Sequence, residues 1–124
     1  MKAYTDLEQS KKLAEILPLE SADNYYSWHD ERYYVVNKDC PYPYSLKAKI
    51  PCWSLASLLE QLHYEVCDDD GYSTYLQINK DDDMYQLEYT DPSEILESIE
   101  TDRYEHFVDA CYEMILKLNE LKML

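Results

Sequence analysis

Apolar side chains recur with a helical period in three segments of this chain, at its start, its middle and its end. The three stripes predict helices over residues 6–17, 54–62 and roughly 102–122. Thr5 and Glu8 have the spacing of a capping box at the start of the first helix. The stripes consist of Leu7, Leu13, Ala14 and Leu17; of Leu55, Leu58, Leu59 and Leu62; and of Phe107, Ala110, Cys111, Met114, Ile115, Leu118 and Leu121.

Runs of β-branched and aromatic residues, alternating with polar ones in the last two, predict five antiparallel strands. The strands are expected over residues 24–28, 32–36, 64–67, 72–79 and 84–90. Asp91, Pro92 and Glu94 have the pattern of a helix N-terminus, which predicts a short helix over 92–99.

The order of these elements predicts an α+β fold. We expect an antiparallel sheet of about four or five strands with the N- and C-terminal helices packed on one face. A length of 124 residues without a low-complexity linker indicates a single domain, residues 1–124.

Charge is the strongest global signal in the composition. The chain has 26 acidic and 11 basic residues, a formal net charge of −15. Such a field repels nucleic acid and anionic membranes and attracts a basic protein partner. The alternative interpretation is that the charge serves solubility alone.

Two aspartate runs, Asp68, Asp69, Asp70 and Asp81, Asp82, Asp83, raise the question of a metal site. The first run precedes Gly71, but an EF-hand loop would then need ligands at Val66 and Gln77, and both positions fail. The intervening strand would hold the runs some 20–25 Å apart, too far to share one ion. We therefore predict two solvated turns that contribute to an acidic surface, and no metal or other cofactor.

The cysteines and histidines offer the main alternative, a small hydrolase or metal-dependent enzyme. None of the four cysteines forms a C-x-x-C pair, and no nucleophile or phosphate-binding motif is present. An enzyme would need the fold to bring together at least two of His29, His63, His106, Cys40, Cys52 and Cys67. No catalytic residue is predicted. The absence of a signal peptide or a membrane-length apolar run favours a cytoplasmic protein with reduced cysteines.

Tyrosine is unusually frequent, with 14 residues against a single phenylalanine. Adjacent aromatic residues in a strand point to opposite faces, so part of the set should be exposed. We expect a binding patch for a protein partner at Tyr26, Trp28, Tyr33, Tyr42 and Tyr44. The third hypothesis is a structural homodimer, joined by a tyrosine-rich sheet face or by the last helix.

Three segments, YTDLEQSKKLAEILPLESAD, IPCWSLASLL and VDACYEMILKLNELKML, together resemble an uncharacterised family of small acidic cytoplasmic proteins from gut bacteria and prophage-like elements. The resemblance covers about half of the chain, mostly both ends and the central helix. It implies a cytoplasmic protein linked to mobile elements, and it brings no activity and no site residues. The leading hypothesis is therefore a non-enzymatic binding or accessory protein, in its sharpest form a nucleic-acid mimic that occupies a basic partner.

Overall fold

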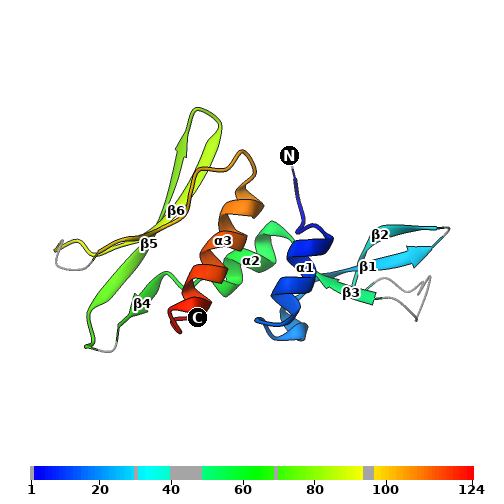
Figure 1. Ribbon diagram of the computed structural model, residues 1–124, viewed down its shortest axis with the longest axis horizontal. Coiled ribbons are helices and arrows are strands. Elements are labelled where there is room, and N and C mark those ends of the chain that lie inside the picture. Colours follow the sequence, from blue (N-terminus) through cyan, green and yellow to red (C-terminus); the bar gives the residue numbers. More distant parts are fainter. Residues whose placement is uncertain (1, 30, 40–48, 69, 94–96) are drawn as a thin grey trace. The chain divides into compact units, whose positions relative to one another are not determined.

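The computed structural model describes residues 2–29, 31–39, 49–68, 70–93 and 97–124. The chain forms two compact units. We call Ala3–Ser57 the first unit, and Met1–Lys2 together with Leu58–Leu124 the second unit. The α+β class is confirmed, because both helices and antiparallel sheets are present (Figure 1).

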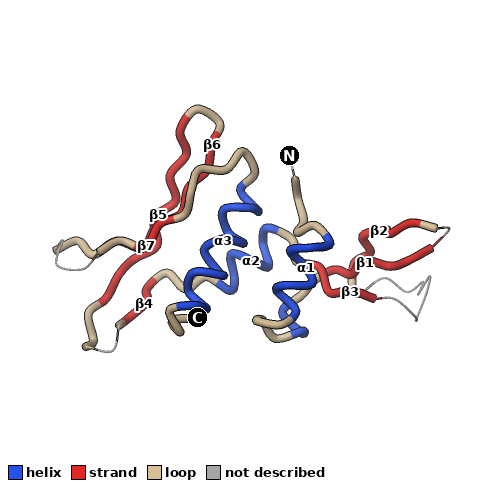
Figure 2. Tube along the Cα trace, viewed as in Figure 1, coloured by secondary structure: helices blue, strands red, loops and turns tan. Residues whose placement is uncertain are grey.

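The predicted strands belong to two sheets instead of one (Figure 2). The first sheet, in the first unit, has the order β2-β1-β3, and the second sheet, in the second unit, has the order β4-β5-β6-β7. The strands are β1 (Asn24–His29), β2 (Arg32–Asn37), β3 (Lys49–Cys52), β4 (Glu65–Cys67), β5 (Ser73–Asp81), β6 (Met84–Thr90) and β7 (Ile99–Glu100). All neighbours are antiparallel.

The terminal helices do not share one sheet face as expected. Helix α1 (Leu7–Ala14) packs against β3 of the first sheet, whereas α3 (Phe107–Glu120) packs against β6 of the second. A third helix, α2, spans Leu55–Gln61, and a short 3-10 helix, η1, spans Leu19–Ser21. Each terminal helix therefore completes the core of its own unit.

Helix α1 begins one residue later than the predicted capping box. Asp6 is the N-cap: its carboxylate accepts from the Gln9 backbone N–H at 2.8 Å, and the Gln9 side chain accepts from Asp6 N–H at 3.1 Å. Thr5 is fully buried, and its hydroxyl bonds to Ser10 Oγ at 2.7 Å. Thr5 is thus part of the core and does not cap the helix.

The core of the first unit is built around Trp53, which is fully buried. Its backbone N–H donates to Thr5 Oγ1 at 3.2 Å, and its carbonyl accepts from Thr5 N–H at 2.9 Å. The indole Nε1–H donates to Ser21 Oγ at 2.9 Å. Through its backbone and its indole, Trp53 therefore connects the N-terminal segment, η1 and the entry to α2.

Asp23 holds Ser54, the residue that caps the start of α2. Its carboxylate accepts from Ser54 N–H at 2.9 Å and from the Ser54 hydroxyl. Partial burial raises the pKa of Asp23, but the hydrogen bonds from the Ser54 side chain and backbone outweigh burial and leave the pKa below its ordinary value of 3.8. The predicted role of Ser54 as a cap is confirmed by the bond from Ser57 N–H to its Oγ at 3.2 Å.

The lowered pKa of Asp23 predicts a pH-dependent contribution to stability. The ionised form is favoured in the folded state, so the contribution is present above pH 3.8 and is lost as the pH falls below that value. We expect Asp23→Asn to lower the free energy of unfolding by about 1–2 kcal/mol near neutral pH, since charge-assisted bonds are replaced by neutral ones. Urea unfolding at neutral pH and at pH values below 4 tests this expectation. A deficit that stays constant between the two conditions would contradict it.

The core of the second unit lies between α3 and the second sheet. Leu87 and Tyr89 of β6 are fully buried, and α3 packs against β6 with most of its predicted stripe buried, although Phe107 is half-buried and Leu121 is exposed. The Tyr89 hydroxyl donates to the carbonyl of His63 at 2.6 Å, and burial raises its pKa to about 12. The stripe buries Val108, Ala110, Cys111, Met114, Ile115 and Leu118.

The helix predicted over 92–99 is wrong at its end, because Ile99–Glu100 is strand β7, paired with Tyr89 and Glu88 of β6. Asp91 does not start a helix, and its carboxylate accepts from Ser93 N–H at 2.9 Å within a turn. Residues 94–96 of the predicted helix lie outside the described residues. Pairing with β6 overrides the local capping pattern here.

Candidate functional site

The net charge is concentrated in the second unit. The first unit contains eight acidic and six basic residues, which gives −2. The second unit contains 18 acidic and five basic residues, which gives −13. Any attraction that this protein exerts on a basic partner therefore originates mainly in the second unit.

The outward face of the second sheet brings three of these acidic residues together. Successive side chains in a strand point to opposite faces, and the buried Leu87 and Tyr89 mark the face toward α3. Glu65, Glu88 and Glu100 lie on the other face, with Glu88 directly opposite Glu100 across the β6–β7 pair. We call these three glutamates the acidic face.

Neutral donors hold two of these carboxylates in place. Ser73 Oγ donates to Glu65 Oε1 at 2.5 Å, and Asn79 Nδ2 donates to Glu88 Oε1 at 3.1 Å. Such bonds orient a carboxylate without cancelling its charge. The acidic face is thus pre-organised and still negative.

Three of the five basic residues of the second unit form ion pairs with carboxylates other than the three of the acidic face. Lys2 Nζ lies 2.7 Å from Asp109, Lys117 Nζ lies 3.6 Å from Glu113, and Arg103 lies 3.1 Å from Asp81. Among the described residues these are the ion pairs of the second unit, and none of them includes a glutamate of the acidic face. These cations offset charge on α3 and at one end of β5, and Lys117 Nζ also donates to the backbone carbonyl of Glu100 at 2.5 Å, beside the acidic face.

The aspartate runs form two turns, as predicted, at opposite ends of β5. In the first, the Asp68 carboxylate accepts from the backbone N–H of Asp70 and of Tyr72, and Gly71 has φ +83°. Asp69 lies outside the described residues.

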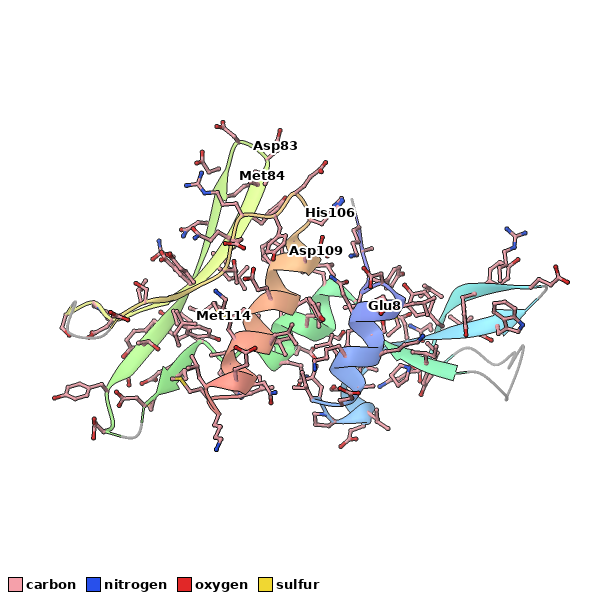
Figure 3. All side chains as sticks on the ribbon, viewed as in Figure 1. Glu8, Asp83, Met84, His106, Asp109 and Met114 are labelled. Atoms are coloured by element: carbon pink, nitrogen blue, oxygen red, sulfur yellow. The ribbon has the colours of Figure 1, made fainter. Side chains whose placement is uncertain are left out.

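The second turn joins β5 to β6 through two left-handed residues, Asp82 with φ 45° and Asp83 with φ 65°. Two consecutive residues of positive φ are the conformation of a type I′ hairpin turn, which aspartate tolerates better than most residues. Asp83 stands at the tip of the hairpin (Figure 3). Both turns therefore add exposed carboxylates around the second sheet.

The predicted aromatic patch is partly assembled in the first unit. Trp28 lies opposite Tyr33 across the β1–β2 pair with ring centroids 4.8 Å apart, and Tyr26 lies 6.3 Å from Tyr33. The Tyr26 hydroxyl, however, donates to Thr5 O at 2.6 Å, and this tyrosine is half-buried. Trp28 is 44% exposed. Tyr42 and Tyr44 lie outside the described residues.

The described cysteines and histidines do not assemble a reaction centre within either unit. Cys52 and Cys111 are buried, and burial raises the pKa of both thiols, that of Cys111 to about 12. Cys67 Sγ contacts Ser73 and Glu65, while the Nδ1 of His106 accepts from the Lys2 backbone N–H at 3.3 Å. The described part of the chain contains no group of three or more His, Cys, Asp or Glu residues that could hold a metal ion.

Cys40 and the side chain of His29 lie outside the described residues. The exposed His63 offers its carbonyl to Tyr89. A nucleophilic cysteine needs a lowered pKa, and the two buried thiols show the opposite shift.

The acidic face was not anticipated from the sequence, which drew attention to the aspartate runs. A signal for it was present, because Glu65 and Glu88 alternate with buried Val66, Leu87 and Tyr89 in the predicted strands. Following the polar half of that alternation would have identified them. Glu100 had no such signal, since β7 was predicted as helix.

Comparison with known proteins gives no relative: no protein-family model, no curated protein and no solved structure matches this chain. Across the residues that the structure describes, helices are too short or too polar to cross a membrane.

Proposed function

We propose that this protein is a non-enzymatic binding protein that engages a basic protein partner through its second unit. The observation that carries the proposal is the outward face of the second sheet, where Glu65, Glu88 and Glu100 stand together in a unit with a net charge of −13. The strand residues of this face include no lysine or arginine. A cytoplasmic location belongs to the same proposal.

Such a face can attract a basic protein during encounter and can discriminate it from acidic proteins. An acidic surface accelerates encounter with a basic protein and disfavours acidic ones, and both effects weaken as salt screens the charges. The same field opposes direct contact with nucleic acid. It also opposes the pairing of two acidic faces, so the proposal does not use this face for a homodimer.

The test is capture from a host lysate by the tagged full-length chain, with identification of every retained protein after washes at low and then high salt. A parallel bait, the acidic-face variant, has Glu65, Glu88 and Glu100 all replaced by glutamine. We expect a basic protein on the original bait at low salt, released at high salt and depleted on the variant. Equal retention on both baits would contradict the proposal.

The narrower hypothesis of a nucleic-acid mimic makes one additional prediction for the captured protein. A mimic occupies the surface that binds nucleic acid, so duplex DNA or RNA added to the complex should displace the chain. If the complex persists in excess nucleic acid, the proposal of a basic partner stands and the mimic hypothesis is wrong.

A further inference from the structure

The side of β5 that faces away from β6 is open over its second half. Leu76 N–H donates to the carbonyl of Tyr64 at 2.8 Å, at the point where the chain enters β4. Backbone groups alternate between the two sides of an antiparallel strand, so those of Ile78 and Lys80 point to the same side as those of Leu76. Among the described residues no strand continues there, and the β5–β6 hairpin extends past β4 (Figure 1).

The opposite edge of the β5–β6 hairpin, along β6, is paired. Leu87 N–H donates to Thr101 Oγ1 at 3.1 Å, and Leu87 O accepts from Thr101 N–H at 2.9 Å. Tyr85 and Tyr104 exchange two backbone hydrogen bonds of 2.6 and 2.8 Å. The segment around β7 thus satisfies the side of β6 that faces away from β5. In the described part of the chain, by contrast, no strand pairs with the two N–H and two C=O groups of Ile78 and Lys80.

The open edge combines an apolar side chain with carboxylates. Ile78 is 47% exposed, which is unusual for an isoleucine in a sheet. Asp81, Asp82 and Asp83 follow at the end of the strand, and Glu88 lies on the adjacent part of β6. Lys80 is directed to the inner face, with Nζ 5.6 Å from the centre of the Tyr85 ring.

Charged residues on an edge strand usually prevent pairing with another copy. Two copies of this edge would bring like charges together, so a second copy is a poor occupant. An extended segment that carries lysine or arginine suffers no such repulsion. The carboxylates therefore disfavour a second copy of this chain and favour a basic extended segment.

We propose that a basic, extended segment of the partner adds to the second sheet as a strand along Ile78–Lys80 of β5. The inference rests on the proposed function and specifies its mode of recognition. Main-chain hydrogen bonds to Ile78 and Lys80 would align the segment. Every second side chain would then lie on the outward face, near the carboxylate of Glu88.

The test uses the full-length chain and two synthetic peptides of equal length and charge, one alternating lysine with valine and one of the same sequence in which every backbone amide is N-methylated. The first can form a strand, whereas the second has no N–H donor on either edge and its methyl groups obstruct pairing. We expect the unmethylated peptide to bind at least about tenfold more tightly, because only it can add backbone bonds.

Two variants of one position separate the backbone from the side chain. Ile78→Pro removes the N–H that points to the open edge and leaves the β5–β6 bonds in place, whereas Ile78→Thr loses the same apolar side chain and keeps the N–H. The proline variant should lose the preference for the unmethylated peptide, and the threonine variant should keep it. Circular dichroism of both variants checks that the sheet persists.

The outcomes distinguish the inference from the function on which it rests. If both peptides bind the unchanged chain equally and the acidic-face variant binds neither, the proposed function stands and the strand-addition inference is overturned. If neither peptide binds at low salt, both are overturned. Since the comparison of the peptides uses the unchanged chain, it decides the inference even if Ile78→Pro fails to fold.

Discussion

Replacing Glu65, Glu88 and Glu100 together by glutamine is expected to weaken binding of a basic polypeptide by about tenfold at low salt. Each exposed charge pair contributes about 0.2–1 kcal/mol, and three such pairs approach the 1.4 kcal/mol of a tenfold change. Glutamine keeps the shape and the acceptor oxygen of each side chain, so the sheet should remain intact. Titration of fluorescent oligolysine, followed by anisotropy at low and high salt, measures the effect.

A matched control separates the acidic face from the total charge. Glu8, Glu15 and Glu20 are exposed residues of the first unit, and replacing all three by glutamine changes the net charge by the same amount. This control variant should lose less than about threefold in affinity, because its three glutamates belong to the first unit and not to the sheet face to which binding is assigned. Equal losses in the two variants would show that oligolysine responds to overall charge and would contradict the assignment of the acidic face.

Trp53→Ala is expected to lower the free energy of unfolding of the first unit by about 3–5 kcal/mol. The substitution removes the largest fully buried side chain and the bond from its Nε1–H to Ser21, leaving a cavity among η1, β3 and the start of α2. Urea unfolding followed by circular dichroism and by the remaining tryptophan measures the loss.

The chain's other tryptophan provides the control. Trp28 is 44% exposed and stacks edge-on against Tyr33, so Trp28→Ala should cost only about 0.5–1.5 kcal/mol. A Trp53→Ala protein that is as stable as the Trp28→Ala protein would show that Trp53 does not organise this core.

Regular elements with a strong period were predictable from the sequence. The apolar stripe of α3 and the alternation in β5 and β6 each depend on neighbours within the same element, so the local pattern was sufficient. Strand β3 was not among the predicted strands, and its sequence contains Pro51, which lacks the N–H that a regular strand donates. The structure places Pro51 opposite Tyr25 on an edge strand, where a residue without an N–H is tolerated.

The division into two sheets was not predictable in the same way. Which strands pair depends on contacts between residues that are distant in the sequence. The leucine stripe of α2 predicts a helix but does not indicate whether the strands before and after it belong to the same sheet. The same limit applies to binding surfaces. The aspartate runs are visible in the sequence because their residues are consecutive. Glu65 and Glu100 lie on one face only because β4 pairs with β5 and β7 pairs with β6.

Amide chemical shifts of the labelled chain, followed as the captured basic partner or oligolysine is added, test the central claim most directly. The account predicts that perturbed amides concentrate in β4 to β7, with the largest changes near Glu88 and along Ile78–Asp81, and that they disappear at high salt. Perturbations centred on Trp28 and Tyr33 in the first unit would contradict it and would assign binding to the aromatic patch.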